Sequence, residues 1–418
     1  MFAPLVFCAA LASSADSSLS ARIEAYIKPY VLDRQLSGTI LVAKGDRVLF
    51  ERSYGMANFE LGVPNRANTS FNIASITKTI TLIPVLQDAA THKLNPRATL
   101  KEFIPDFPKG EKITLLDLIN HRSGIPHSVT MPADEVVSQN AESMTRLAAK
   151  AQLLFEPGTK EEYSSAGFSV LARVLELIEG KAYDEIIRDQ VFRPAGMENS
   201  TSCLSQYFIK NRAPSYIQTL DGVWPSQPQD YSYLVGAGCI NSTPRDLFKL
   251  LRAVTSGKLG EVVRKNLGDS PQIYWNGLTD GFRAFVQYDR ADGVTVICCA
   301  NTVTGAAERI REALPKIVRG QSVATPERLQ VKKANLTTAQ LAKFVGEYRI
   351  GNERFKMSVR DGYLLAGNTV LVPIAEDRFF AIRDYGEVRA TWTTEGKVQK
   401  LDWYEGNSLI VTMTPVSS

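Results

Sequence analysis

The order of hydrophobic patterns along the chain constrains its fold more than any other feature of the sequence. Residues 38–55 alternate apolar and polar side chains around a turn-like segment, which predicts a hairpin of two strands. Strand patterns return at 282–288 and 293–300, whereas apolar residues at helical spacing dominate the middle of the chain. We therefore predict an α/β (α+β) fold, an antiparallel sheet flanked by helices with an inserted all-helical region at about 81–230.

Helical patterns occupy most of the sequence between these strands. The predicted helices span 75–90, 115–120, 141–154, 167–178, 183–191 and 306–318. Another helix begins where Thr243 can cap its N-terminus, Pro244 fits the first helical position and Asp246 follows in the first turn. Strands and helices together predict one domain over residues 16–318.

The sequence changes character after this domain. Residues 319–336 are polar and fit a linker. Short apolar runs then recur, separated every ~8 to 12 residues by turn-forming pairs such as Asp361-Gly362. We predict a separate all-β domain over 337–418, an antiparallel sandwich or barrel. The length of 418 residues agrees, because about 150 residues per domain gives two or three domains.

The N-terminal residues 1–15 form an apolar run that ends in small residues, which predicts a signal peptide cleaved near Ala15. A basic residue ahead of the run is missing, so the start is either truncated or unusual. The run is too short to span a bilayer, and no later stretch of about 18 apolar residues follows it. We expect an exported protein, periplasmic or secreted, without a stable membrane span.

Charge and cysteine usage exclude several classes of protein. The chain has 48 Lys and Arg against 44 Asp and Glu, and its net charge of +4 is too small to indicate a nucleic-acid partner. The five cysteines form no Cys-x-x-Cys pair, which argues against structural zinc, thioredoxin-like chemistry and a disulfide framework. We expect Cys239, Cys298 and Cys299 to pack as small apolar side chains.

The chain has only three histidines, His92, His121 and His127. They are scattered without paired acidic residues, so we predict no metal site and no cofactor. His121 fits a structural hydrogen-bonding residue at a helix end, and the other two fit plain loop positions. None lies in a turn typical of a nucleophile, so a mechanism without imidazole suits this chain.

A candidate nucleophile lies at the start of the first predicted helix, in the pattern Ser-x-x-Lys formed by Ser75 and Lys78. Residues three apart share one face of a helix, so the amine can reach the hydroxyl. A lysine kept partly neutral by burial can take the proton of a serine that is otherwise a poor nucleophile. Alone this pattern is weak, because a surface Ser and Lys would look the same.

Two later triplets strengthen the hypothesis that Ser75 is a nucleophile with Lys78 beside it. Tyr163–Ser165 precedes a helical pattern, and Trp275–Gly277 precedes a strand pattern. With Ser75 and Lys78 ahead of them, this order resembles the serine β-lactamase and penicillin-binding superfamily, in its class C-like branch. That branch includes D-peptidases, β-lactamases and family VIII carboxylesterases. The resemblance covers about residues 30–318, with further similar stretches at 113–126, 162–180, 191–197 and 236–247.

The resemblance implies a role for each matching residue. Ser75 would be the nucleophile that forms an acyl-enzyme, and Lys78 and Tyr163 would share the transfer of protons. The backbone N–H groups of Ser75 and Leu278 would form the oxyanion hole. Ser165, Trp275, Asn276 and Gly277 would contact the substrate.

Two of these positions depart from the family pattern. Ser165 replaces an asparagine, which exchanges an amide for a shorter hydroxyl. Trp275 replaces the lysine or histidine that helps to hold a substrate carboxylate, and family VIII carboxylesterases share this tryptophan. An uncharged aromatic wall favours neutral esters or amides over anionic penicillins. Arg283 could restore a cation, although a solvated strand residue is the simpler interpretation.

Three functions remain open at this stage. The first is a serine hydrolase (carboxylesterase or β-lactamase-like) that cleaves a neutral ester or amide, a small-molecule substrate. The second is a D-amino-acid-specific peptidase or β-lactamase-like enzyme, and the third is a non-catalytic ligand-binding protein. The C-terminal domain resembles the small lipocalin-like barrels attached to some members of the superfamily. It could mediate a homo-oligomer, cap the site, or add only stability.

Overall fold

The computed structural model describes the following residues: 5–131, 133–202, 208–227, 229–351 and 353–416. They form two compact units. The sheet unit consists of Gly38–Pro214 and Gln227–Asn301, and the barrel unit consists of Met1–Ser37, Ser215–Ser226 and Thr302–Ser418.

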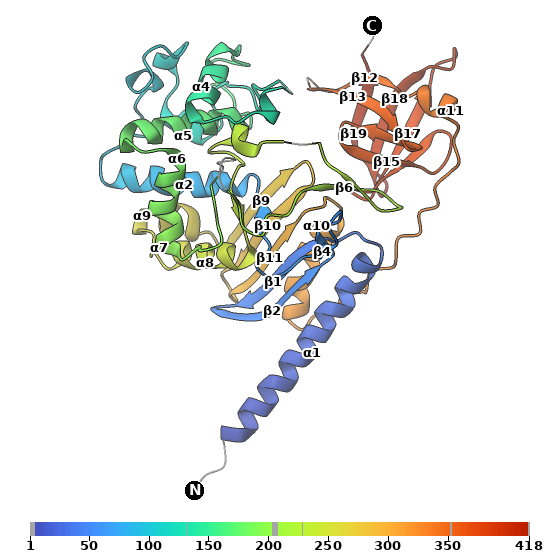
Figure 1. The fold of residues 1–418 in the computed structure, drawn as a ribbon, viewed down its shortest axis with the longest axis horizontal. Helices are drawn as coiled ribbons and strands as arrows, with labels where there is room; N and C mark the ends of the chain where they lie inside the picture. Colours follow the sequence, from blue (N-terminus) through green and yellow to red (C-terminus); the bar gives the residue numbers. More distant parts are fainter. Residues whose placement is uncertain (1–4, 132, 203–207, 228, 352, 417–418) are drawn as a thin grey trace. The chain divides into compact units, whose positions relative to one another are not determined.

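The sheet unit is built on one five-stranded antiparallel sheet (Figure 1). Its order is β2-β1-β11-β10-β9, with bounds β1 Gly38–Lys44, β2 Arg47–Tyr54, β9 Gln272–Thr279, β10 Phe282–Asp289 and β11 Val294–Ala300. Because β1 pairs with β11 along its whole length, from Gly38 opposite Ala300 to Lys44 opposite Val294, the first and last strands of the unit lie side by side within the sheet. The predicted antiparallel sheet is confirmed.

Helices fill the chain between β2 and β9. They are α2 Ile76–Ala90, α3 Leu115–Ile119, α4 Ala141–Lys150, α5 Ser165–Glu179, α6 Tyr183–Ile187, α7 Arg193–Ala195, α8 Pro244–Thr255 and α9 Glu261–Val263. The caps explain where several begin, because a side-chain oxygen accepts an N–H of the first turn. Thr114, Asn140, Ser164 and Thr243 each cap a helix in this way. The predicted cap at Thr243 is confirmed, and the helix predicted to reach 154 ends at Lys150.

Short strand pairs complete the sheet unit. They are β3 Met56–Asn58 with β4 Val63–Pro64, and β5 Phe71–Asn72 with β8 Asn241–Ser242. Two apolar cores lie inside the unit, one against the sheet and one among the helices. Cys298 and Cys299 are free and fully buried in β11, as expected. Cys239 is buried but disulfide-bonded, so the prediction that it packs as a plain apolar side chain is wrong.

The barrel unit contains a closed eight-stranded antiparallel barrel, which confirms the predicted β domain (Figure 1). Its strands are β12 Gly346–Ile350, β13 Glu353–Arg360, β14 Tyr363–Ala366, β15 Thr369–Pro373, β16 Arg378–Ala381, β17 Gly386–Trp392, β18 Val398–Glu405 and β19 Ser408–Pro415. The short helix α11 (Thr338–Ala342) precedes them, so the domain is not purely β. Buried side chains fill the interior, where the rings of Phe344 and Phe379 lie 4.9 Å apart.

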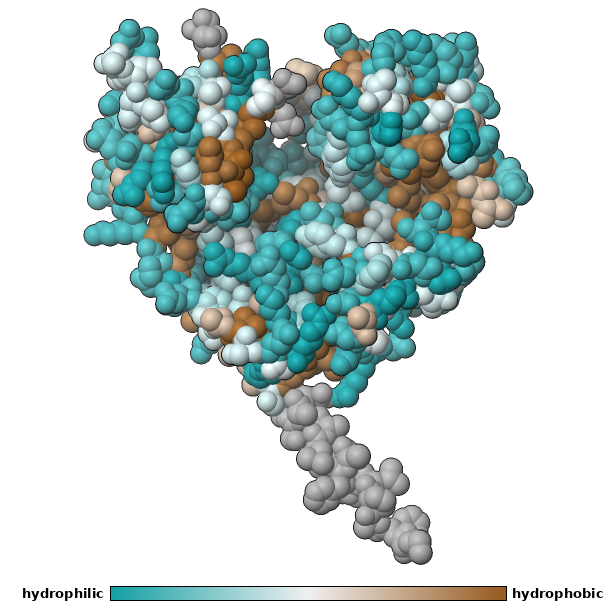
Figure 2. Space-filling model, turned by 180° about the vertical axis from the view of Figure 1, so that it is seen from behind, coloured by the Kyte–Doolittle hydropathy of each residue, from teal (hydrophilic) through white to brown (hydrophobic). Residues whose placement is uncertain are grey.

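The rest of the barrel unit comes from three other parts of the chain. They are α1 Leu5–Leu32, the hairpin β6 Tyr216–Gln218 and β7 Val223–Pro225, and α10 Ala306–Val318. In the described part of the chain, no helix is both long and apolar enough to cross a membrane. Hydrophilic side chains cover most of the face seen in Figure 2, with separate hydrophobic patches.

Candidate active site

Ser75 lies at the N-terminus of α2, where a tight turn presents its hydroxyl. Ala74, just before it, has a φ of 47°, a left-handed conformation that costs energy in a residue other than glycine. The side chain of Asn72 holds this turn, because its Oδ1 accepts the N–H of Ala74 at 2.8 Å and its Nδ2 donates to the carbonyl of Gly238 at 3.0 Å. The backbone before α2 is therefore fixed from two sides.

Lys78 lies one turn along α2 and points back at Ser75. Its Nζ donates to the Oγ of Ser75 at 3.3 Å, to the Oγ of Ser165 at 3.1 Å and to the carbonyl of Ala237 at 3.0 Å. Only 6% of the residue is exposed. Burial lowers the pKa of Lys78 to about 7, so much of this amine is neutral near neutral pH and can accept a proton.

Tyr163 approaches the same hydroxyl from the loop before α5. Its Oη donates to the Oγ of Ser75 at 2.8 Å, and its ring centroid lies 4.7 Å from the Nζ of Lys78. Burial raises the pKa of Tyr163, although the hydrogen bond to Ser75 works in the opposite direction. The phenol therefore keeps its proton at neutral pH, and Lys78 is the group able to act as a base.

Two histidines lie beside Tyr163, although neither lies in the turn that carries Ser75. The ring of His121 is 4.5 Å from that of Tyr163, and its Nδ1 accepts the N–H of Ser164 at 3.1 Å. Burial, helped by the charge of Lys78, lowers the pKa of His121 to about 4, so it is neutral. His127 was predicted to be a plain loop residue, but its ring lies 5.4 Å from that of Tyr163 and it lines the cavity at Ser75.

Strand β9 forms the edge of the sheet and passes close to the turn before α2. A Cβ atom on Gly277 would lie 2.1 Å from the carbonyl oxygen of Ile73, so only glycine fits. A two-residue turn joins Thr279 to Phe282, and in such a hairpin the flanking pair is hydrogen-bonded. The next pair, Leu278 with Arg283, is then the one whose N–H groups point out of the ladder, so Leu278 can offer its N–H at the sheet edge.

The other predicted contact residues of β9 lie elsewhere. Trp275 is 8% exposed and belongs to the apolar core of the sheet unit, outside the lining of the cavity at Ser75. Asn276 is exposed on the opposite face of the strand and accepts a hydrogen bond from Arg283. Arg283 also donates to the hydroxyl of Tyr274 at 3.2 Å. The structure thus brings Ser75, Ser165 and Leu278 to one cavity, whereas none of the three residues of the triplet Trp275–Gly277 lines it.

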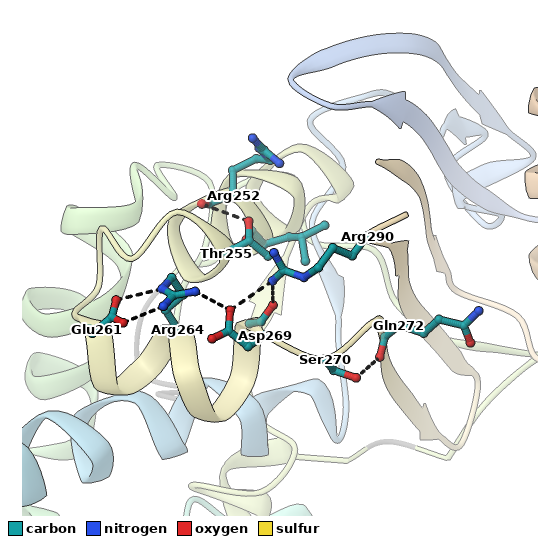
Figure 3. A network of polar contacts seen from close by, with 10 residues as sticks. Arg252, Thr255, Glu261, Arg264, Asp269, Ser270, Gln272 and Arg290 are labelled. Atoms are coloured by element: carbon teal, nitrogen blue, oxygen red, sulfur yellow. Dashed lines mark hydrogen bonds and ion pairs between the residues drawn. The ribbon is translucent and has the colours of Figure 1, made fainter. Parts of the chain in front are cut away.

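A network of polar contacts lies at the ends of β9 and β10, the two strands of the hairpin at the sheet edge (Figure 3). Arg264 binds both carboxylate oxygens of Glu261, at 2.6 and 2.8 Å, and also contacts Asp269 at 2.5 Å. Arg290, which directly follows β10, contacts the same Asp269 at 3.4 Å. Ser270 donates to the carbonyl of Gln272, the first residue of β9, at 2.6 Å. The network thus connects the segment after α8 to both strands of the hairpin.

The cavity beside Ser75 has a volume of about 260 Å³. Its walls combine polar and apolar side chains: Ser75, His127, Ser128, Val129, Thr130, Glu135, Met144, Ser165, Ala166, Gln229, Tyr233, Leu234, Ala237, Gly238, Leu278, Thr279 and Asp280. Sequence reasoning missed His127, Glu135 and Asp280, and one sequence holds no signal for them, because they come from separate loops. Among the described residues, no group of three or more His, Cys, Asp or Glu could hold a metal ion.

Comparisons with known proteins agree on the fold of the sheet unit. The beta-lactamase family model matches residues 23–317. Penicillin-binding protein 4* of Bacillus subtilis (strain 168) is 26% identical over 408 residues, covering 83% of this chain and 88% of that protein. The teichoic acid D-alanine hydrolase of Staphylococcus aureus (strain MRSA252) is 28% identical over 233 residues, covering 56% of this chain and 58% of that protein.

Solved structures also match nearly the whole length of the chain. The octameric penicillin-binding protein homologue from Pyrococcus abyssi covers 95% of this chain and 96% of its own, with a TM-score of 0.62 and 17% identity. At that identity the likeness concerns the fold alone. It extends the shared architecture beyond the sheet unit to the barrel.

Proposed function

This chain belongs to the beta-lactamase family, and from that premise we propose that it is a serine hydrolase that cleaves a small ester or amide through an acyl-enzyme on Ser75. One observation carries the proposal. The Oγ of Ser75 is contacted both by the Nζ of Lys78, at 3.3 Å, and by the Oη of Tyr163, at 2.8 Å. A nucleophile, a base that is partly neutral and a proton donor thus meet at one atom.

In the proposed acylation, neutral Lys78 takes the proton of Ser75 as its Oγ bonds to the substrate carbonyl carbon. The carbonyl oxygen becomes an oxyanion, which the N–H groups of Ser75 and Leu278 stabilise at the N-terminus of α2. The intermediate then collapses, and the leaving group takes the proton of Tyr163. Lys78 returns its proton to Tyr163, so both groups end as they began.

In the proposed deacylation a water molecule attacks the ester carbon on Ser75, and its proton passes to the neutral Lys78. The bond between the carbon and the Oγ of Ser75 then breaks, and Lys78 gives the proton to the Oγ, so the free acid leaves and both groups return to their starting states. Ser165 supports this cycle, because its hydroxyl accepts a hydrogen bond from the Nζ of Lys78 at 3.1 Å. A serine in place of the family's asparagine therefore still holds the amine.

The alternative of a D-amino-acid-specific peptidase or a β-lactamase-like enzyme draws support from the relatives named above, one of which is a D-alanine hydrolase. One feature argues against penicillins, which are anionic. The buried Trp275 stands where the family resemblance implies a cation that helps to hold a substrate carboxylate. The alternative of a non-catalytic protein is disfavoured by the contacts at Ser75, since a lost reaction places no demand on such geometry.

The decisive test compares the wild type with Ser75→Ala on p-nitrophenyl acetate and butyrate. We expect hydrolysis by the wild type and its loss in the variant, together with an acyl adduct on Ser75 in intact-mass spectra. Ser256→Ala, an exposed serine at the end of α8, is the matched control. Equal rates for the wild type and Ser75→Ala would refute the hydrolase. Nitrocefin and a D-Ala-D-Ala peptide, tested in parallel, separate the alternatives.

We also propose that the protein is exported. The apolar run over residues 1–15 supports export, and so does Cys239, because disulfide bonds persist in oxidising compartments. Mass spectrometry of the protein recovered from a cell envelope or medium fraction tests this. Recovery of the full-length, reduced chain from the cytoplasm would contradict it.

For the barrel unit we propose a role in forming a homo-oligomer. The support is the similar fold of a homologue described as octameric, which shares the barrel region in its alignment. Native mass spectrometry of the full chain measures its assembly directly. A monomer at all concentrations would leave the barrel as a stabilising appendage.

A further inference from the structure

The cavity at Ser75 has an uneven charge distribution. Of the residues that line it, Glu135 and Asp280 are the charged ones, and both are acidic. They come from different parts of the sheet unit, Glu135 from a short helical turn after α3 and Asp280 from the turn between β9 and β10. Both are partly buried. A substrate held at Ser75 therefore shares its cavity with two acidic residues.

The carboxylate of Glu135 is held in place by its neighbours. Thr130 donates to one of its oxygens at 2.9 Å, and Gln229 donates to the other at 3.4 Å. Thr130 and Gln229 line the same cavity. Each carboxylate oxygen thus accepts a hydrogen bond from a neutral donor, and the two contacts orient the group within the cavity.

Asp280 lies two residues beyond Leu278, so it is close to the proposed oxyanion hole. The hydroxyl of Tyr231 donates to its carbonyl at 3.3 Å, which fixes this turn. The charges of Glu135 and Asp280 both act on Tyr233, another residue that lines the cavity. Burial raises the pKa of Tyr233 most, and the charges of Glu135 and Asp280 raise it further. Arg283 lies on the same hairpin, so we expect Asp280 to contribute less than Glu135.

We propose, on the basis of the proposed hydrolase function, that Glu135 and Asp280 select substrates whose acyl group carries an ammonium, namely aminoacyl esters or amides. An ammonium is attracted to this part of the cavity, whereas a carboxylate is repelled. The acyl group becomes bonded to Ser75 in acylation and is released in deacylation, so it is the part of the substrate that must fit the cavity in both half-reactions. Lys78 adds no opposing charge while it is neutral.

The size of the cavity limits the acyl group. The cavity volume of about 260 Å³ lies just below the usual range of ligand pockets, and it suits one amino-acid unit better than a long peptide. Val129, Met144 and Leu234 supply apolar surface for a small side chain. The proposed substrate thus has an uncharged scissile ester or amide bond and a positively charged ammonium on its acyl group.

A matched set of three achiral acyl groups tests the proposal. Glycyl, propionyl and malonyl groups place an ammonium, a methyl and a carboxylate at the same distance from the carbonyl, each as its methyl ester and p-nitroanilide. We expect kcat/KM for glycyl to exceed that for propionyl by about tenfold or more, with malonyl slowest. Raising the salt concentration should narrow the differences.

Variants assign the preference to the two residues. In Glu135→Gln we expect the glycyl-to-propionyl ratio of kcat/KM to fall about tenfold, with a smaller fall of that ratio in Asp280→Asn. Glu111→Gln, an exposed carboxylate outside the cavity, is the control that removes the same charge. An unchanged ratio in Glu135→Gln and Asp280→Asn together would overturn the proposal.

The outcomes separate this inference from the function on which it rests. Hydrolysis that depends on Ser75 but shows no charge preference would refute the ammonium selection alone. Turnover that survives Ser75→Ala, or none on any probe, would refute the hydrolase itself. A preference for a charged leaving group, measured with the choline ester of propionic acid against its uncharged 3,3-dimethylbutyl ester, would contradict the placement of the ammonium on the acyl side.

Discussion

The two walls of the candidate site contribute different things. The helical wall, formed by α2 and the start of α5, supplies side chains: Lys78 and Ser165 are buried and each contacts a named atom. The strand wall, formed by β9, supplies backbone, because Gly277 permits the close approach and Leu278 offers an N–H. Side-chain identity is therefore constrained on the helical wall, whereas on the strand wall the side chain of Trp275 packs into the core and not into the cavity.

The largest expected effect comes from changing the base on the helical wall. In Lys78→Arg the guanidinium stays protonated at every working pH, so it cannot take the proton of Ser75. We expect kcat/KM to fall by about 10³-fold or more, as for loss of a general base. Steady-state rates and the yield of the acyl adduct measure this.

The matched control is Lys93→Arg, which changes an exposed lysine paired with Glu179 in the same unit. It should leave kcat/KM within twofold. If Lys78→Arg keeps more than about a tenth of the wild-type activity, the general base is a group other than Lys78. The proposed role of the helical wall would then be wrong.

The second prediction concerns the backbone of the strand wall. In Gly277→Ala the new Cβ meets the carbonyl oxygen of Ile73 at 2.1 Å, so β9 must move away from the turn before Ser75. Because the N–H of Leu278 moves with it, we expect kcat/KM to fall about 10²-fold, as for a displacement near 1 Å. Thermal unfolding, measured alongside, separates misplacement from loss of the fold.

Gly222→Ala, where the nearest atom to a new Cβ is 3.9 Å away, is the control for adding a methyl group. A Gly277→Ala variant that keeps the wild-type rate would show that the close approach does not position the oxyanion hole. The backbone of the strand wall would then have no demonstrated part in catalysis.

The third prediction is the pH dependence of kcat/KM, which reports the free enzyme. Burial lowers the pKa of Lys78 to about 7, and its neutral form is the active one. Activity should therefore rise about tenfold per pH unit below that value and level off above it. His121, with its pKa lowered to about 4, is neutral throughout and adds no second step near neutrality.

Rates on an uncharged ester from about pH 5 to about pH 9 measure the profile. A rate that still rises tenfold per pH unit up to about pH 9 would mean that Lys78 keeps an ordinary pKa and is charged in the free enzyme, whereas a flat profile would mean that Lys78 is not the base. An activity that falls with rising pH would instead require a protonated group for catalysis.

The sequence predicted the helical wall better than the strand wall for a physical reason. The spacing of Ser75 and Lys78 is one helical turn, so their contact follows from local geometry alone. Tyr163 joined them only through the resemblance to a family, since its contact with Ser75 is non-local. The register of β9 was also not readable, because a triplet does not say which of its residues faces the core. Trp275 was therefore interpreted as part of the pocket.

The same contrast holds for the rest of the chain. Alternating patterns and turn pairs predicted the closed barrel and the antiparallel sheet, because strand faces and tight turns are local properties. The cavity walls at His127, Glu135 and Asp280 depend on how distant loops meet. No periodicity encodes such a meeting, so these residues appeared only in the structure.

The smallest expected effect on catalysis comes from Trp275→Phe, which tests the core placement of this side chain. Because Trp275 packs in the core of the sheet unit rather than in the cavity, its loss should lower the free energy of unfolding by about 1–3 kcal/mol. The ratio of ester to nitrocefin turnover should stay within threefold. Denaturant unfolding and the two rates measure both effects, with Trp224→Phe in the barrel unit as the matched control. A tenfold shift toward nitrocefin would place Trp275 at the substrate after all and would make the strand wall a contributor of side chains.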